Sequence, residues 1–319
     1  MSILPARSST LRIKQHVMVP MLGLAAMTIG AAPAQANYQD VIQASNPAFY
    51  YTWDDAEPIY SEDEPDLLLN HGYADGGDAV GGGQHAVAPS TTNAGGLSLG
   101  NAGSFGGTIE QAWWTGFTGG SAPNDGTYSS YAMEFWIYFD GEQSPTYIFQ
   151  SAPNGWNGQN APSVINGYEG NGLEIFTNDG RTGASFPTLA SNAWNHVVMG
   201  YEAIDGATNR QTLILNGDYA NATSVALIDD HEDFPNFSAD VMFAIGDEVF
   251  NKGLFQGMLD EFAIYDLSDE ASVDARLEEF AGHYSATSTV IPTPAALPAG
   301  LLLLGAIAMR RRPQNGLFV

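Results

Sequence analysis

The chain has 319 residues, no cysteine, 44% hydrophobic residues and a formal net charge of −26 at pH 7. Because cysteine is absent, the chain can form no disulfide, thiol nucleophile or thiolate metal site. A charge this negative repels nucleic acids and anionic membranes and attracts cations, which excludes nucleic acid as a partner.

The basic and acidic residues occupy different parts of the chain. Every acidic residue lies between Asp40 and Glu279, whereas most basic residues lie outside that range: Arg7, Arg12, Lys14, Arg310, Arg311 and Arg312. Such an acidic middle keeps a protein soluble, and it can also supply cation sites. Its length and apolar content suit one large domain with a packed core.

Residues 1–36 are expected to be a signal peptide. A positively charged segment ending at Lys14 precedes an apolar run at residues 17–32. Ala34 and Ala36 then form an A-x-A cleavage motif directly before Asn37. The pattern predicts export with cleavage after Ala36. The alternative is an uncleaved anchor helix, for which the apolar run is short.

Several runs between residues 37 and 284 alternate apolar and polar side chains, as strands with a buried face do. The first strand is predicted at residues 49–53, after a turn at Asn46-Pro47. Residues 131–139 carry apolar groups on both faces, which is typical of a central strand in a two-sheet sandwich. Further strands are predicted at residues 147–150, 172–177, 194–201, 213–215 and 225–228, with Asn216-Gly217 as a type I′ turn.

The last two strands, predicted at residues 241–245 and 254–265, are central to the expected fold. In the second strand the apolar residues keep a period of two up to Leu259, and the next one, Phe262, comes three residues later. A slip of this kind is typical of a β-bulge, here at Asp260-Glu261.

The period changes after residue 268. Val273, Leu277 and Phe280 follow a helical spacing, and Asp269 and Glu270 come early, where a helix N-terminus favours anions. A short helix is therefore predicted to pack across an edge of the sandwich.

Short motifs in this middle part resemble laminin-G-like, concanavalin-A-like jelly-roll domains. They are Glu134-x-Trp136, Trp194-x-His196-Val197, Asn216-Gly217 after aliphatic residues, and Gly257-x-Leu259-Asp260-Glu261-Phe262. The resemblance implies an all-β, concanavalin-A-like jelly-roll sandwich of two antiparallel sheets, with a short helix after the last strand. It predicts one domain over residues 37–284 with about 12–14 strands.

The C-terminal part has a three-part design. Residues 285–294 form a Ser/Thr/Pro-rich spacer, and residues 295–319 hold an apolar run followed by an arginine cluster. The run is shorter than the ~20 residues that span a bilayer comfortably as a transmembrane helix. This design resembles PEP-CTERM sorting signals, although Pro292-Thr293-Pro294 replaces the usual Pro-Glu-Pro.

The PEP-CTERM resemblance implies an exosortase-type processing enzyme as a partner and membrane contact through the C-terminal segment, either transient or retained. It also implies delivery to the cell surface, the outer envelope or the extracellular matrix of a bacterium. The alternative is a plain C-terminal anchor.

Three tryptophans lie in Gly- and Asn-rich stretches: Trp113, Trp114 and Trp156. An aromatic face can stack on a sugar while neighbouring amides, here those of Asn157 and Asn160, bond its hydroxyls. Two adjacent tryptophans cannot both face inward in a strand, so one of Trp113 and Trp114 is expected to be exposed. The alternative is that these aromatic residues only pin long loops to the sandwich.

Calcium is a possible cofactor because it prefers six to eight oxygen ligands. The candidate ligands are Asp54, Asp55, Asp247, Glu248 and Asp260, with Glu261 beside the last. The jelly-roll resemblance implies that calcium can lie near strand ends. No EF-hand spacing occurs, and an acidic chain also offers carboxylate pairs by chance.

A glycan-active enzyme is one alternative to a binding module. A glycoside hydrolase needs two carboxylates about 5–10 Å apart across a cleft. Asp260 and Glu261 are adjacent and would face opposite ways in a regular strand, and His196 is expected to be a packed residue. A structural matrix protein without a small ligand is the other alternative. The sequence favours an exported, surface- or matrix-associated, non-enzymatic module that binds polysaccharide.

Overall fold

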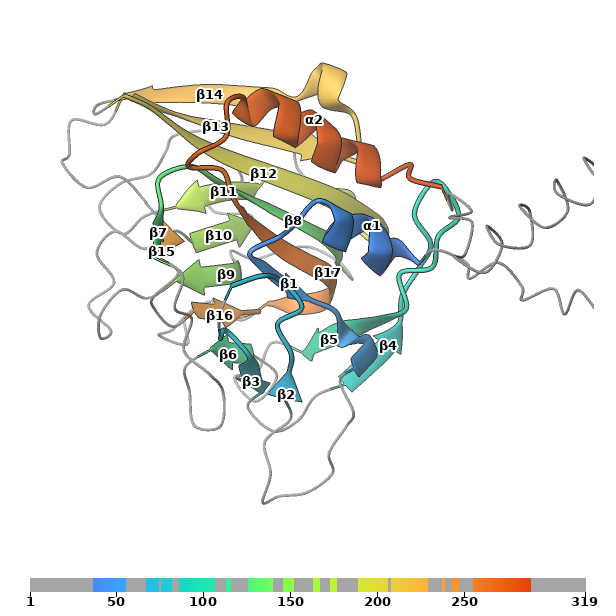
Figure 1. Cartoon of the computed structure of the whole chain (residues 1–319). Helices are drawn as coiled ribbons and strands as arrows, with labels where there is room; N and C mark the ends of the chain where they lie inside the picture. The colour runs from blue at the N-terminus through green and yellow to red at the C-terminus, as the bar shows by residue number, and fades with distance from the viewer. Residues whose placement is uncertain are drawn as a thin grey trace, which may run out of the picture.

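The computed structural model describes residues 37–55, 67–74, 76–81, 86–106, 113–115, 126–139, 146–151, 163–166, 173–176, 189–205, 208–228, 237–238, 243–246 and 255–287. They form two antiparallel sheets packed face to face, with two helices outside one sheet (Figure 1). The predicted all-β sandwich of two antiparallel sheets, with a short helix after the last strand, is confirmed.

Sheet A has eight strands, and β17 lies near its middle. Its order is β14 (Thr223–Ile228), β13 (Thr208–Leu215), β12 (Trp194–Asp205), β8 (Tyr131–Tyr138), β17 (Gln256–Asp266), β5 (Asn101–Gly106) and β4 (Ala86–Pro89), and β1 (Phe49–Tyr51) also pairs with β17.

Sheet B has seven strands. Its order is β11 (Leu173–Phe176), β10 (Ser163–Asn166), β9 (Thr146–Ser151), β16 (Phe243–Ile245), β6 (Trp113–Thr115), β3 (Ala79–Gly81) and β2 (Leu67–Leu68). A separate pair joins β7 (Thr127–Tyr128) to β15 (Phe237–Ser238). The described residues alone contain 17 strands, more than predicted, because the short strands of the Gly-rich part show no periodicity.

The predicted β-bulge in β17 is confirmed. The register of β17 against β8 shifts between Asp260 and Ala263, so that two residues face one on the partner strand. Glu261 has a φ of 53°, which is rare for a residue other than glycine and costs on the order of 1–3 kcal/mol. The bulge also separates the two neighbours of β17, because β5 pairs before it and β1 after it.

The main core lies between the two sheets. Phe262, just beyond the bulge, stacks on Phe135 of β8 and Phe149 of β9, with ring centroids 5.5 and 5.6 Å apart. Leu259 and Ile264 belong to the same buried cluster. The three-residue step between Leu259 and Phe262 thus keeps one apolar face directed at sheet B, as the bulge requires.

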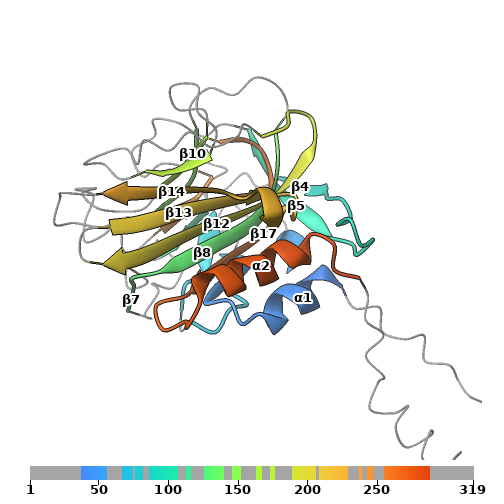
Figure 2. The same ribbon diagram turned by 90° about the horizontal axis from the view of Figure 1, so that it is seen from above.

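A second core lies on the outer face of sheet A, beneath α1 (Tyr38–Ala44) and α2 (Val273–His283), which lie side by side there (Figure 2). Leu277 and Phe280 of α2 and Ile42 of α1 are at most 1% exposed. The alternation expected in β8 is therefore correct, and each of its faces packs against a different layer.

Both helices differ from what the sequence predicted. The predicted helix α2 covers a face of sheet A rather than an edge, and Gly200 of β12 leaves room for Leu277. Helix α1 was not predicted, although Asn37 and Asp40 form a capping box at its start. Its seven residues are too few to show a helical period, and the predicted strand after it ends at Tyr51.

The described residues also include two 3-10 helices, η1 (Trp53–Asp55) and η4 (Tyr219–Asn221). Asn216 and Gly217 both have positive φ, as predicted, but the turn continues into η4 before β14 begins. Within the described part of the chain, no helix is long and apolar enough to cross a bilayer. The predicted signal peptide, the sorting segment and most of the spacer lie outside the described residues.

Candidate functional site

Glu134 is a carboxylate in the middle of sheet A with no exposure to solvent. Along β8, Glu134 lies on the same face as Ala132 and Trp136, which is the face that the helices cover. A buried carboxylate is costly unless donors surround it, so its partners decide what it can do.

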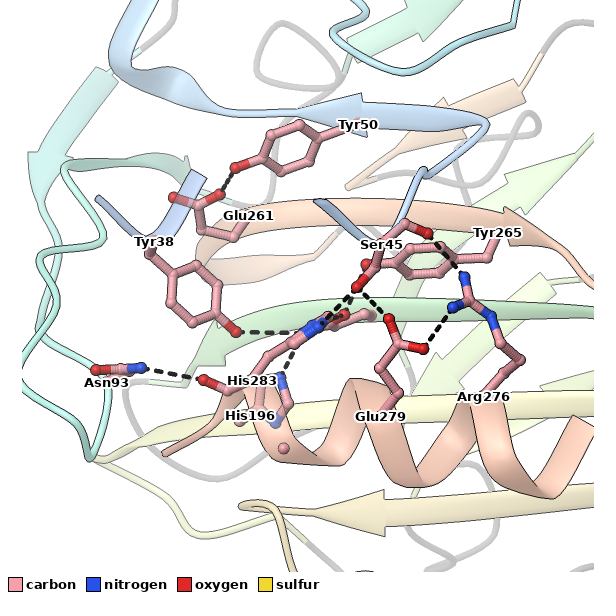
Figure 3. Close-up of polar contacts among 12 residues, drawn as sticks. Tyr38, Ser45, Tyr50, Asn93, His196, Glu261, Tyr265, Arg276, Glu279 and His283 are labelled. Carbon is pink, nitrogen blue, oxygen red and sulfur yellow. Dashed lines mark hydrogen bonds and ion pairs between the residues drawn. The ribbon is translucent and has the colours of Figure 1, made fainter. Parts of the chain in front are cut away.

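Four side chains from four elements contact the Glu134 carboxylate, and Figure 3 labels these four partners, Tyr38, His196, Tyr265 and His283. The hydroxyl groups of Tyr38 (α1) and Tyr265 (β17) donate to it at 3.2 and 2.8 Å. His196 Nε2 (β12) lies 2.8 Å from Oε1, and His283 Nδ1 (α2) lies 3.0 Å from Oε2. We call these five residues the Glu134 cluster.

The two histidines make different contacts. His196 Nδ1 is buried and has no hydrogen-bond partner among the described residues, so the ring is best satisfied with its hydrogen on Nε2. His283 Nε2 lies 3.0 Å from the Ser45 hydroxyl, so both of its ring nitrogens have polar partners. His283 can therefore carry two ring hydrogens without burying an unsatisfied donor.

Electrostatics make Glu134 and His283 a buried ion pair. Burial alone would raise the pKa of Glu134, but the charge of His283 and hydrogen bonds from both histidines lower it to about 2. Burial alone would lower the pKa of His283, but the Glu134 carboxylate raises it above its ordinary value. The carboxylate is thus held ionised by its neighbours.

Around this pair, α2 is attached to both α1 and sheet A. The Ser45 hydroxyl at the end of α1 donates to Glu279 Oε1 at 2.6 Å. Arg276 donates to the Ser45 carbonyl at 2.7 Å and also pairs with Glu279. Arg210 of β13 pairs with Asp274 at 2.8 Å. Both arginines of the described residues therefore hold α2 in place.

A second group of acids lies at the bulge. Asp260 pairs in register with Trp136, whose side chain lies on the helix side of sheet A, and Tyr50 on the same side donates to Glu261 Oε2. Adjacent acids would face opposite ways in a regular strand, but the predicted bulge turns both onto one face.

Unlike Glu134, the two acids at the bulge, Asp260 and Glu261, have no cationic partner among the described residues. Burial raises the pKa of Asp260 and of Glu261 well above the usual range, and the charge of Asp260 adds to the effect on Glu261. The charge of Asp54 raises the pKa of both groups further. Their neutral forms are therefore favoured, in contrast to Glu134.

This arrangement limits the chemistry that the described acids can perform. Glu134, Asp260 and Glu261 are at most 1% exposed, and α1 and α2 cover the face on which they lie. A glycoside hydrolase needs its two carboxylates on either side of a bound sugar, which these acids cannot reach. Across the described ranges, no three His, Asp or Glu side chains are grouped as a metal site.

The structure describes some of the predicted ligand-binding residues and not others. Trp113 in β6 is 1% exposed and belongs to the core between the sheets. Trp114 pairs in register with Val80 and Ala244, and its side chain lies outside the described part. Trp156, Asn157 and Asn160 also lie outside the described residues.

Of the predicted calcium ligands, Asp54 and Asp260 are brought close enough to interact electrostatically. Asp54 Oδ1 accepts the backbone N–H of Asn101 at 2.7 Å, and Asp260 Oδ1 accepts that of Glu261 at 2.9 Å. The side chain of Asp55, and Asp247 and Glu248 entirely, lie outside the described residues. Calcium binding stays a prediction.

The Glu134 cluster was not predicted as a unit. His196 was expected to be a packed residue, and it is 0% exposed, as predicted. A carboxylate at Glu134 among apolar residues signals a buried charge that needs partners. Nothing in the sequence identifies His283 as that partner, because the two residues are 149 positions apart.

Comparisons with known proteins agree with the fold. Residues 115–271 match the sequence model of a protein family described as the concanavalin A-like lectin/glucanases superfamily. This stretch runs from β6 to the turn before α2, so the described sandwich is a concanavalin-A-like domain, as the resemblance implied. None of the curated proteins matches this chain.

Solved structures with similar outlines include three carbohydrate-related proteins. Domain 4 of AbnA, a GH43 extracellular arabinanase from Geobacillus stearothermophilus in complex with arabinotriose, is 17% identical with a TM-score of 0.47, over 74% of this chain and 98% of that one. A GH54 α-L-arabinofuranosidase is 8% identical with a TM-score of 0.47, and the match covers 79% of this chain and 66% of the arabinofuranosidase chain. The binding domain of Botulinum neurotoxin DC in complex with SialylT is 11% identical with a TM-score of 0.46, over 76% of this chain and about half (52%) of that one.

Proposed function

We propose that this protein is an exported, surface- or matrix-associated binding module for polysaccharide, without enzymatic activity. The observation that carries the proposal is the burial of Glu134 beneath two helices, and of Asp260 and Glu261 at the neighbouring bulge, in a concanavalin-A-like domain. The description of that family names both lectins and glucanases. The burial of these acids favours a binding function over a glucanase-like activity.

The helices also restrict where a polysaccharide can bind. Because α1 and α2 pack on the outer face of sheet A, the proposed binding surface is the outer side of sheet B or the rim of the sandwich. Strands β6, β16 and β9 are neighbours in sheet B. Trp114 belongs to β6, and Trp156 follows β9 in the chain.

The test uses a glycan array probed with the secreted protein, with calcium and with a chelator. With Trp113 in the core, Trp114 is the exposure candidate of its pair, and Trp114→Ala and Trp156→Ala should each abolish retention while the protein stays folded. The matched control is Trp113→Ala, which should cost about 3–5 kcal/mol of stability because it removes a core side chain. Retention by both the Trp114 and the Trp156 variant, as strong as by the wild type, would contradict the assignment of these residues.

The same assay separates the alternatives. Release of reducing ends from a retained glycan would identify a glycan-active enzyme instead. A lack of both retention and cleavage would favour a structural matrix protein that contributes charge and bulk. Loss of retention only in the chelator would support a calcium site, for which Asp54 and Asp260 are the described candidates.

Export and C-terminal sorting rest on the sequence motifs at the two ends. Mass spectrometry of the mature protein gives the processed length directly. A chain that begins at Asn37 and lacks residues 295–319 would support cleavage by a signal peptidase and by an exosortase-type enzyme. Retention of the C-terminal segment would instead support a plain anchor.

A further inference from the structure

We propose that Glu134, His283, Ser45 and Glu279 form a proton-dependent latch, which holds α1 and α2 on sheet A and loosens in alkaline medium. This device is independent of the polysaccharide-binding proposal. It concerns how the two helices, which come from opposite ends of the domain, stay attached to the outer face of the sheet.

The latch is a continuous chain of hydrogen bonds across three elements. His283 of α2 faces Glu134 of β8 at 3.0 Å and the Ser45 hydroxyl, beyond the end of α1, at 3.0 Å. Ser45 in turn lies 2.6 Å from Glu279, one helical turn earlier in α2. Other polar or charged groups around the chain include Tyr38 of α1, Asn93, His196 of β12, Glu261 and Tyr265 of β17 and Arg276 of α2.

The chain of hydrogen bonds is complete only when His283 is protonated on both ring nitrogens. With both ring nitrogens protonated, Nδ1 donates to Glu134, Nε2 donates to Ser45, and the single Ser45 hydroxyl hydrogen is free to reach Glu279. If His283 keeps only the Nδ1 hydrogen, Ser45 must serve either Nε2 or Glu279. If it keeps only the Nε2 hydrogen, a lone pair faces the Glu134 carboxylate.

Loss of the proton therefore removes one contact in either tautomer, and it also leaves the buried Glu134 charge without its cation. A buried carboxylate that loses its charged partner is strongly destabilised. The raised pKa of His283 agrees with this coupling, because the contribution of the proton is complete below the ordinary histidine value and is lost as the pH rises through the folded-state value.

Ser45 makes the coupling extend to α1. Its backbone carbonyl accepts from Arg276 and its hydroxyl contacts His283 and Glu279, so the end of α1 follows the position of α2. At the other end of α1, Tyr38 donates to Glu134 itself. Opening uncovers the outer face of sheet A, including the buried Trp136 and Tyr265.

The test is amide hydrogen exchange of the full-length protein at pH 6 and pH 9, corrected for the intrinsic rate. In the wild type we expect the protection of α1 and α2 amides to fall by about tenfold or more at pH 9, while β8 and β12 amides stay protected. In His283→Gln this pH dependence should vanish. His71→Gln, at a histidine outside the latch, should retain it.

A second variant keeps the test decisive if His283→Gln fails to fold. Ser45→Ala leaves the pair of Glu134 and His283 in place and removes the hydroxyl link from His283 to the end of α1, while Arg276 still contacts the Ser45 carbonyl and Tyr38 still contacts Glu134. It should reduce the pH dependence of α1 protection and leave that of α2 unchanged. Equal protection at both pH values in the wild type, or wild-type pH dependence of α1 in Ser45→Ala, would overturn the latch.

Discussion

At the scale of single residues, Glu134 shows how one buried charge is made tolerable. It sits in a strand whose other residues are apolar, and it accepts from two tyrosines and two histidines. Each donor comes from a different element, so the carboxylate joins α1, β12, β17 and α2 to β8. Net stabilisation by such an ion pair is small, but breaking it by removing one partner is costly.

Glu134→Gln should therefore lower the free energy of unfolding by about 3–5 kcal/mol, because an amide cannot accept from all four donors and leaves His283 without its counter-charge. Urea denaturation at pH 6 measures the change. The control is Glu278→Gln on the exposed side of α2, expected within about 0.5 kcal/mol of the wild type. Equal midpoints for the two variants would contradict the role given to Glu134.

At the scale of elements, the position of α2 on sheet A depends on a glycine of the sheet as well as on the residues of the helix. A Cβ at Gly200 in β12 would lie 2.6 Å from Leu277 Cδ1, so the Leu277 side chain or the helix that carries it would have to shift. Phe280, one turn later, stacks on Tyr265 with ring centroids 3.9 Å apart. Helix α2 is therefore closely packed on sheet A at Leu277 and Phe280.

Gly200→Ala should accordingly destabilise the protein by about 1–3 kcal/mol through overpacking under the helix. The matched control is Gly282→Ala, near the end of the same helix, where an added Cβ meets nothing within 4 Å. That change should be neutral or stabilise by about 0.5–1 kcal/mol, because alanine is the better helix former. Thermal unfolding of both variants measures the difference in stability. A larger loss of stability in Gly282→Ala than in Gly200→Ala would contradict the close packing of Leu277 against Gly200.

At the scale of the whole molecule, the domain has three layers: sheet B, sheet A and the helix pair (Figure 1). The outer face of sheet A carries ionisable groups at its centre, which is unusual for a surface buried under helices. In one half, Glu134 is paired with His283, and in the other Asp260 and Glu261 are buried together. The stability of the whole fold should therefore depend on pH.

The sign of that dependence follows from the direction of each pKa shift. Glu134 has a lowered pKa, so its contribution is complete above about pH 4.5 and is lost as the pH falls toward about 2. His283, Asp260 and Glu261 have raised pKa values, so their contributions decline as the pH rises. Urea midpoints should be highest in mildly acidic medium and lower at pH 9, and a midpoint that rises from pH 6 to pH 9 would contradict the assignment.

Much of the sandwich could be predicted from the sequence because strand patterns are local. Alternation in residues 131–139 shows a strand buried on both faces, and the three-residue step from Leu259 to Phe262 locates the bulge. Both signals involve neighbouring residues, for which side-chain direction follows directly from backbone geometry. The closing helix is likewise visible in its own spacing.

The tertiary structure alone decided where the charges and helices meet. Tyr38, Glu134 and His283 are spread over most of the domain, and no local pattern can indicate that they share one buried site. The bulge at Asp260 and Glu261 was visible in the sequence, but its effect on which face they share depends on the register with β8. Local periodicity sets the direction of each side chain, whereas its partners depend on how distant segments pack.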